Sequence, residues 1–197
     1  MIGELLMTLM KRVVRAFGFL LFTVVFVTLL FGSFWQSQAI KIKGHIPKQY
    51  IETYKAAGKE YNIDWQLLAA VHRVETNFSR SKSMVSNAGA IGPMQFLPLT
   101  WVGWNYPGKN NEVTEKDLTD VKIIAKYGGY GVDGDGDGIA DPMNAVDAIY
   151  STANYLNKTK ASIDRKHLKK AIFDYNHSDI YVRDMLYYHD LYKELYK

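Results

Sequence analysis

Two short stretches carry most of the information in this chain: VHRVETNF at residues 71–78 and GAIGPMQF at residues 89–96. The first predicts the end of a helix with a carboxylate, Glu75, on its apolar side. The second has the glycine and proline content of a loop and contains an amide side chain, Gln95. A partly buried acid beside a polar, glycine-lined loop indicates a site for proton transfer to a bound ligand.

The helix that carries Glu75 is expected over residues 65–77, with Asp64 as its N-cap. Because each residue turns a helix by about 100°, Glu75 falls about 20° from Leu68, on the face that packs. Burial raises the pKa of a carboxyl group, so such a glutamate keeps its proton near neutral pH and can act as an acid.

Two further interpretations of this helix end remain open. Periodicity alone does not distinguish a buried acid from a solvated Glu75 paired with Arg73 or Arg80. His72 lies one turn before Glu75 and could tune its acidity, although a packed histidine with satisfied hydrogen bonds is the simpler expectation.

Composition and charge exclude several classes of protein. With 197 residues, 48% of them hydrophobic, the chain has room for one packed domain and an appended segment. It has no cysteine, which excludes disulfides and thiolate metal sites. The net charge is +4, but residues 36–197 contain 21 basic and 19 acidic residues, so no nucleic-acid partner is expected.

The N-terminal segment is strongly apolar. Residues 16–36 contain no charged side chain and are long enough to cross a bilayer. Cationic residues precede them within residues 1–15, a flank that stays in the cytoplasm by the positive-inside rule. We therefore expect a single-pass anchor in the cell membrane, a linker over 37–46 and an extracytoplasmic domain over 47–197.

A cleaved signal peptide is the alternative for this segment. Ser37-Gln38-Ala39 is a small-x-small triplet, and cleavage near Ala39 would release the domain. The apolar run is longer than that of a usual signal peptide, which favours an uncleaved anchor.

The remaining chain predicts a mainly α domain. Residues 105–120 are polar and turn-rich and are expected to form a surface excursion. The further segments with helical spacing are 46–61, a short one starting at Pro98, 142–157, 169–175 and 180–196.

The last of these helices is expected to be capped by Ser178 or Asp179. One of its sides is rich in aromatic residues, which we assign to core packing. The residues on that side are Tyr181, Met185, Tyr188 and Tyr192.

The sequence DGDGDG at residues 133–138 has the ligand spacing of a calcium-binding loop, with carboxylates at positions 1, 3 and 5 and glycine at position 6. Position 12 is Asn144 instead of glutamate, so we expect a lengthened loop that closes on Asp147. The oxygen ligands that this interpretation predicts are Asp133, Asp135, Asp137, the carbonyl of Ile139, and Asp147. Bound Ca²⁺ would be structural.

Other catalytic motifs are missing from the sequence. The histidines lack a zinc-site spacing such as HExxH, and no serine lies in a GxSxG elbow. The chain has no phosphate-binding loop.

Three motifs together resemble those of lytic transglycosylases with a goose-type-lysozyme-like SLT fold: Glu75-Thr76, residues 92–95 and Tyr175-Asn176. The resemblance runs from about residue 50 to the C-terminus. These muramidases cleave peptidoglycan between N-acetylmuramic acid and N-acetylglucosamine. The acidic loop and the segment after it look like the B-type membrane-bound subfamily, which has an EF-hand-like Ca²⁺ loop. There the catalytic glutamate is usually followed by serine, and Thr76 keeps the hydroxyl.

The resemblance implies a lysozyme-like helical domain in which Glu75 is the sole acid and base. Glycan strands of peptidoglycan would be the substrate, and closure of a 1,6-anhydro ring on muramic acid would end the reaction. The substrate-binding residues that it implies are Thr76, Met94, Gln95, Phe96, Tyr175 and Asn176, with the contact at Met94 made by the backbone.

Two alternative functions remain. A hydrolytic muramidase of the same fold would use water in place of the internal hydroxyl group. A calcium-stabilised module could bind the wall without cutting it, although retention of Glu75 beside Gln95 and Asn176 argues against this.

Overall fold

The computed structural model describes residues 45–197, and the predicted anchor over 16–36 lies outside the described residues. The described part is helical, and its only extended pairing consists of isolated bridges. No helix in residues 45–197 is both long and apolar enough to cross a membrane. The helices are α2 (Lys48–Tyr61), α3 (Trp65–Thr76), α4 (Pro98–Val102), the 3-10 helix η1 (Asn110–Glu112), α5 (Glu115–Thr119), α6 (Val121–Tyr127), α7 (Ala145–Lys158), α8 (Arg165–Asn176) and α9 (Asp179–Leu195).

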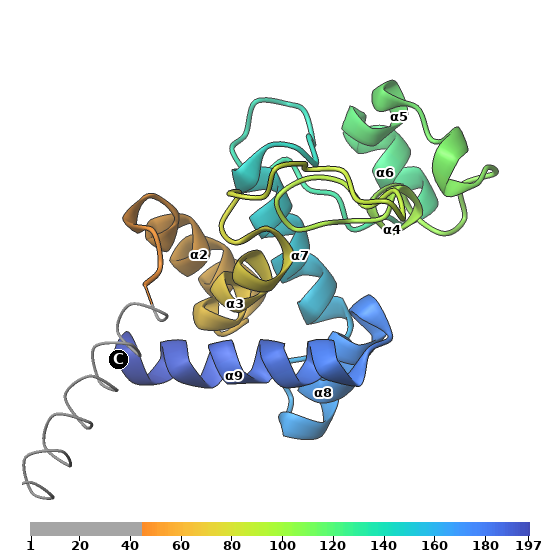
Figure 1. Cartoon of the computed structure of the whole chain (residues 1–197). Coiled ribbons are helices and arrows are strands. Elements are labelled where there is room, and N and C mark those ends of the chain that lie inside the picture. The colour runs from red at the N-terminus through yellow and green to blue at the C-terminus, as the bar shows by residue number, and fades with distance from the viewer. Residues whose placement is uncertain (1–44) are drawn as a thin grey trace, which may run out of the picture. The chain divides into compact units, whose positions relative to one another are not determined.

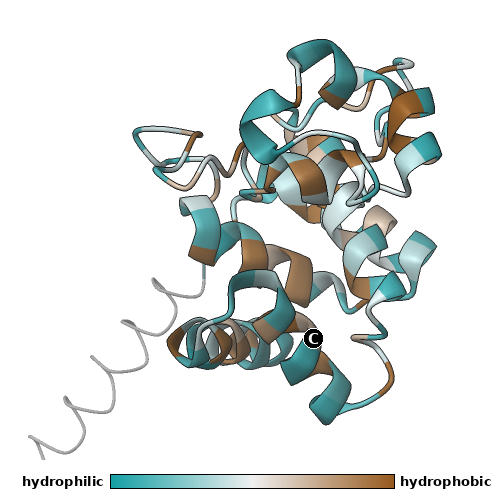
Figure 2. Cartoon of the chain, turned by 90° about the vertical axis from the view of Figure 1, so that its right-hand side faces the viewer, coloured by the Kyte–Doolittle hydropathy of each residue, from teal (hydrophilic) through white to brown (hydrophobic). Residues whose placement is uncertain are grey.

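Helix α3 lies in the middle of the main group of helices, in contact with α2, α7 and α9 (Figure 1). Its central residues Leu68, Ala69 and Ala70 are fully buried. Small alanine side chains let the neighbouring helices approach closely, and the buried apolar surface stabilises the group by about 25 cal/mol per Å². Apolar and polar residues alternate along the helices in Figure 2, as amphipathic helices around a shared core require.

The short helices α4, α5 and α6 form a second group, which Figure 1 shows on the side away from α9. Trp101 of α4 is fully buried, and its indole nitrogen donates to the carbonyl of Leu118 at 2.8 Å. The predicted surface excursion over 105–120 therefore contains η1 and α5. Thr114 and Asp120 cap α5 and α6 through their side chains. These capping residues indicate helices, but in a segment rich in polar residues they were interpreted as part of a loop.

Several helix boundaries differ from the expected ones. Asp64 holds the N-cap position of α3 but makes no capping bond, because Lys193 donates to its carboxylate at 2.7 Å. Helix α7 starts at Ala145 instead of near Pro142, since Asn144 caps it. Helix α9 has the expected cap, in which Ser178 accepts from a backbone amide of the first turn.

The loop over residues 89–96 passes very close to the end of the acidic loop. A Cβ atom on Gly92 would lie 1.8 Å from the carbonyl oxygen of Pro142, and Gly92 has a φ of +78°. No L side chain fits there, so the glycine is required by a backbone contact and not by a ligand. Gly89 also has a positive φ, but its surroundings are open.

Candidate active site

Glu75 lies in the last turn of α3, and its side chain is partly buried. Burial raises the pKa of Glu75 to about 7, while a hydrogen bond from Tyr181 acts in the opposite direction. Of the two interpretations that periodicity left open, a buried acid and a solvated Glu75 paired with Arg73 or Arg80, the structure supports the buried acid. Arg73 turns away from it, donates to Asn77 and lies over the rings of Phe78 and Tyr188.

The partner of Glu75 is Tyr181, in the first turn of α9. Its hydroxyl donates to Oε1 of Glu75 at 2.5 Å. The ring of Tyr181 lies parallel to that of Tyr175, with 6.3 Å between the ring centres. Assignment of Tyr181 to core packing alone was therefore incomplete. The ring is buried, but its hydroxyl group belongs to the site, and helical periodicity carries no information about a contact 106 residues away.

The backbone of residues 92–95 is held by side-chain donors on successive carbonyl groups. The hydroxyl of Thr76 donates to the carbonyl of Pro93 at 2.7 Å, and that of Tyr175 donates to the carbonyl of Met94 at 2.7 Å. The amide of Gln95 donates to the carbonyl of Gly92 at 2.8 Å. Glu75 and this loop are thus connected through helix α3 itself and through Tyr181, on which Tyr175 stacks.

Two of the predicted substrate-binding residues have their side chains behind this loop. Thr76 is 1% exposed and the side chain of Met94 is fully buried, so neither presents its side chain to a ligand. This corrects the expectation that Thr76 contacts substrate, whereas the expectation for Met94 concerned the backbone near it, which the burial of its side chain does not test. Both stabilise the loop, Thr76 through its hydroxyl and Met94 through its place in the core. Thr76 directly follows Glu75 on α3. Because each residue turns the helix by about 100°, the side chain of Thr76 points into the core.

Three other predicted residues meet at one groove. Gln95, Phe96 and Tyr175 line a cavity of about 190 Å³, but Phe96 is 2% exposed and, like Thr76, offers little surface to a ligand. Phe96 packs edge-on against Tyr175, with 5.8 Å between the ring centres. The residues of this groove that the sequence did not single out for binding are Leu97, Thr100, Trp104, Tyr130, Tyr155, Thr159 and Asp174.

The groove combines aromatic rings with polar side chains. Trp104 is one of the lining residues and is 64% exposed. An exposed indole offers a flat apolar face beside polar groups. Asn176 ends α8 and is exposed, and no side-chain hydrogen bond is found for it within residues 45–197. Its amide is available to a ligand.

A left-handed turn follows the helix of Glu75. Asn77, Phe78 and Ser79 have φ values of 52°, 61° and 61°, a run that is unfavourable for residues with a Cβ atom. The ring of Phe78 is 2% exposed, so its burial offsets part of the cost. The amide of Ser79 donates to Oγ1 of Thr76 at 3.1 Å, which joins the turn to the loop over 92–95.

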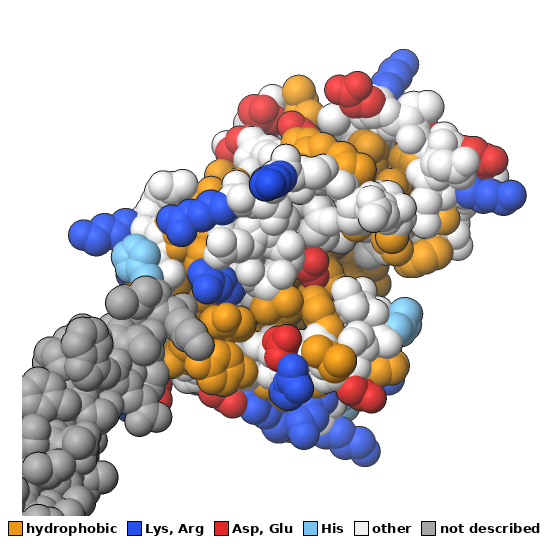
Figure 3. All heavy atoms as spheres, viewed as in Figure 1, with side chains coloured by type: hydrophobic (Ala, Val, Ile, Leu, Met, Phe, Trp, Pro, Cys, Tyr) orange, Lys and Arg blue, Asp and Glu red, His pale blue; other side chains and the backbone are white. Residues whose placement is uncertain are grey.

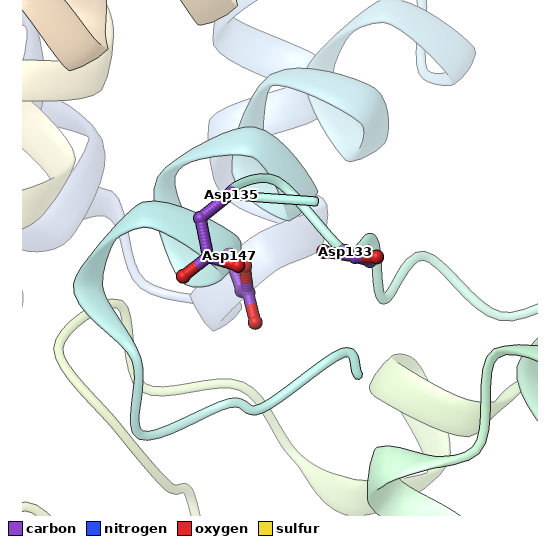
Figure 4. A group of neighbouring side chains, drawn as sticks. All are labelled: Asp133, Asp135 and Asp147. Atoms are coloured by element: carbon purple, nitrogen blue, oxygen red, sulfur yellow. The ribbon is translucent and has the colours of Figure 1, made fainter. Parts of the chain in front are cut away.

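The acidic loop gathers three carboxylates. Asp133, Asp135 and Asp147 each offer one oxygen atom, and these atoms all lie within 4.8 Å of one another. Figure 4 shows Asp133 and Asp135 on the loop and Asp147 on helix α7. Asp147 is 1% exposed and accepts from the amides of Gly134 and Asp141, each at 2.8 Å.

One of the predicted calcium ligands, Asp137, lies outside this cluster. Its Oδ1 accepts from the amide of Ile139 at 2.8 Å. The predicted ligand at Ile139 is its carbonyl oxygen, and this assignment stays a prediction. Asn144, at position 12 of the loop, donates its amide to Asp135 at 2.7 Å. The oxygen-rich donor set of Asp133, Asp135 and Asp147 fits a hard divalent cation.

Comparisons with known proteins agree with these features at a coarse level. Residues 123–166 match the family model of the transglycosylase SLT domain, a segment that holds the acidic loop and α7 but not Glu75. The chain is also similar to the L-Ala–D-Glu endopeptidase of Bacillus subtilis (strain 168), with 28% identity over 152 residues. The alignment covers 77% of this chain and 44% of that protein, so the chain spans less than half the length of its relative.

With the mainly helical fold, these matches support an SLT, lysozyme-like domain, a class of enzymes that degrades peptidoglycan. They do not distinguish a B-type subfamily, and they bear on neither calcium nor the membrane.

Proposed function

We propose that this protein is a peptidoglycan lytic transglycosylase that cleaves the β-1,4 bond between N-acetylmuramic acid and N-acetylglucosamine. The observation that supports this best is Glu75. Its pKa is raised to about 7 by burial, against the opposing effect of the hydrogen bond from Tyr181. Most glycosidases need two carboxyl groups, whereas a transglycosylase can work with one.

In the first step, protonated Glu75 gives its proton to the glycosidic oxygen, and the bond from that oxygen to the anomeric carbon breaks. The N-acetyl oxygen of the same muramic residue stabilises the anomeric carbon. A pKa near 7 leaves a large fraction of Glu75 protonated at neutral pH, as a general acid requires.

In the second step, the Glu75 carboxylate removes the proton of the C6 hydroxyl group, whose oxygen bonds to the anomeric carbon and closes the anhydro ring. Tyr181 donates to Oε1 of Glu75 and stabilises the carboxylate between the two steps. The internal hydroxyl has a high effective concentration relative to water, which favours ring closure over hydrolysis.

The glycan strand lies along the groove formed by Gln95, Phe96 and Tyr175, with Trp104 as a stacking surface at its edge. Support for this placement comes from Tyr175, which lines the groove, stacks on Tyr181 and holds the carbonyl of Met94. The amide of Asn176 is exposed next to Tyr175 and is suited to bind an N-acetyl or hydroxyl group.

The catalytic assignment can be tested with the full-length protein and purified peptidoglycan. Glu75→Gln keeps the shape of the side chain and removes its proton transfer, so release of soluble muropeptides should fall at least a hundredfold. Glu60→Gln, an exposed glutamate of α2, is the matched control and should keep wild-type activity. Unchanged release by Glu75→Gln would refute the assignment.

We also propose a structural Ca²⁺ held by Asp133, Asp135 and Asp147. The ion would neutralise three carboxylates gathered within 4.8 Å and stiffen the backbone that Gly92 contacts at Pro142. It would take no part in proton transfer, because Glu75 supplies that chemistry.

Residues 16–36 supply the membrane anchor in this proposal, and the catalytic domain faces the wall. The full-length chain should remain in the membrane fraction after alkaline washing, with its N-terminus intact. A mature N-terminus just after Ala39 would instead show a secreted protein.

The endopeptidase activity named for the Bacillus relative is not carried over to this chain. The alignment covers only 44% of that protein, at 28% identity. The buried acid and the groove of Gln95 and Tyr175 favour a glycan substrate.

A further inference from the structure

A buried histidine connects the core of the domain to the wall of the candidate active site. His72 of α3 has no exposed surface. Its Nδ1 lies 2.7 Å from the hydroxyl of Tyr54, and its Nε2 lies 2.8 Å from Oγ of Ser79. Both ring nitrogens thus have partners, one in helix α2 and one in the left-handed turn after α3.

The partners determine which nitrogen carries the proton. The hydroxyl of Tyr54 is buried, and within residues 45–197 its recorded hydrogen-bond partner is Nδ1 of His72. A buried hydroxyl needs an acceptor for its proton, so Tyr54 donates and Nδ1 accepts. Nε2 then carries the hydrogen and donates to Ser79.

From Ser79 the contacts continue to the active-site loop. The amide of Ser79 donates to Oγ1 of Thr76 at 3.1 Å, and Thr76 donates to the carbonyl of Pro93 at 2.7 Å. Asn77, Phe78 and Ser79 all have positive φ, so this turn needs outside contacts to persist. His72 supplies two such contacts. One is a hydrogen bond to Ser79, and the other is an edge-on contact with the ring of Phe78, with 5.6 Å between the ring centres.

We propose that His72 is a positioning residue: in its neutral Nε2–H form it holds the turn over residues 77–79 and, through Thr76, the loop over 92–95 beside Glu75. It touches neither substrate nor Glu75 in this account. The part that concerns catalysis rests on the proposed function, whereas the part that concerns the turn does not.

The tautomer gives a readout that needs no activity. In the full-length chain labelled with ¹⁵N-histidine, long-range ¹H–¹⁵N spectra should show His72 with hydrogen on Nε2 at neutral pH. Burial lowers the pKa of His72 to about 4, so this spectrum should not change between pH 8 and about 6. A hydrogen on Nδ1, or an imidazolium, would overturn the proposal.

Variants test the connection to the loop. His72→Phe keeps an aromatic ring without hydrogen bonds, and should speed amide exchange at Ser79 and lower kcat about tenfold with little change in KM. His72→Gln can accept from Tyr54 and donate to Ser79, so it should restore most of the protection from amide exchange at Ser79 and most of kcat. Ser79→Ala removes the acceptor on a half-exposed side chain and should mimic His72→Phe in a stably folded protein.

His189 is the matched control, because it too is a buried histidine of the described residues and lies on α9 beside Asp64. His189→Phe should leave exchange at Ser79 unchanged. Wild-type exchange at Ser79 in both His72→Phe and Ser79→Ala would refute the proposal. If Glu75→Gln keeps full activity, the proposed function fails, and the tautomer and exchange still decide the role of His72.

Discussion

The hydroxyl of Tyr181 donates a 2.5 Å hydrogen bond to Oε1 of Glu75, which joins the first turn of α9 to the last turn of α3. The bond favours the ionised carboxylate, whereas burial favours the protonated acid. Because burial prevails, Glu75 titrates near pH 7 and can exchange a proton in both directions at neutral pH.

Removal of this hydrogen bond should move the titration of Glu75 upward. Tyr181→Phe keeps the ring and its packing on Tyr175 but removes a bond that stabilises the carboxylate by about 1.5–3 kcal/mol, or about one to two pH units. The limb of the pH–rate profile on which activity falls with rising pH should shift upward accordingly, with a maximal rate about tenfold lower.

The control for this variant is Tyr187→Phe, which removes an exposed hydroxyl of the same helix. It should leave the profile unchanged. A wild-type profile in Tyr181→Phe would show that the hydroxyl has no influence on Glu75.

Burial of Glu75 should make stability depend on pH. The pKa of Glu75 is raised from 4.5 to about 7, so the folded protein binds the proton more tightly than the unfolded chain does. The protonated form is favoured in the fold, and stability falls as pH rises from about 4.5 through 7, by about 3 kcal/mol in all. Glu75→Gln removes this loss, so its melting temperature should exceed that of the wild type at pH 8.

The difference in melting temperature between Glu75→Gln and the wild type should shrink as pH falls. It should be smallest near pH 4.5, where Glu75 is largely protonated in both the folded and the unfolded state. Calorimetry at several pH values measures it. An equal difference between the two proteins at pH 4.5 and pH 8 would mean that Glu75 does not titrate abnormally.

The contact of Gly92 with Pro142 predicts a sharp contrast between two glycines. Gly92→Ala places a Cβ atom 1.8 Å from a carbonyl oxygen and must displace the loop, at a cost of several kcal/mol and with large loss of activity. Gly89→Ala meets open space and suffers only its positive φ, about 1 kcal/mol. Chemical denaturation of both variants tests this, and similar costs would contradict the close approach.

Calcium should stabilise the fold without altering the chemistry. A free concentration about a hundred times the dissociation constant adds about 2.7 kcal/mol to the free energy of unfolding, and chelation removes it. Asp135→Asn should abolish this gain. Asp137→Asn should retain it, because the Asp137 carboxylate lies outside the cluster and an asparagine can still accept from the amide of Ile139.

Thermal unfolding with Ca²⁺ or a chelator measures the effect. An unchanged melting temperature of the wild type with added Ca²⁺ would contradict the calcium site. If both variants lose the stabilisation by Ca²⁺ equally, Asp137 is a ligand as well.

Local sequence signals predicted the helical domain and the position of its acid. The Leu68–Glu75 spacing placed the carboxyl group on the packed face of α3, and the structure confirms its burial. The same periodicity could not reveal Tyr181, since a contact between α3 and α9 depends on how the two helices pack. Thr76 was expected to contact substrate and is buried, because sequence shows which residues neighbour a motif but not which way their side chains face.

Loop chemistry was predictable only in part. The DGDGDG sequence indicated a cation site, yet the turn directs Asp137 to the backbone and brings Asp133, Asp135 and Asp147 together. The glycines of residues 89–96 were expected to line the site beside Glu75, and the close neighbour of Gly92 is the backbone of Pro142. The face shown in Figure 3 has both acidic and basic groups interspersed, as the near balance of charge in residues 36–197 leads one to expect.

The proposed role of Glu75, one carboxyl group that cuts the glycan and closes an anhydro ring, determines the chemical ends of the products. Mass spectrometry of muropeptides released from purified peptidoglycan by the full-length protein identifies those ends. We expect 1,6-anhydromuramic ends, each lighter by one water than a reducing end, and their absence with Glu75→Gln. Reducing muramic ends without anhydro products would show a hydrolytic muramidase and contradict the proposed role.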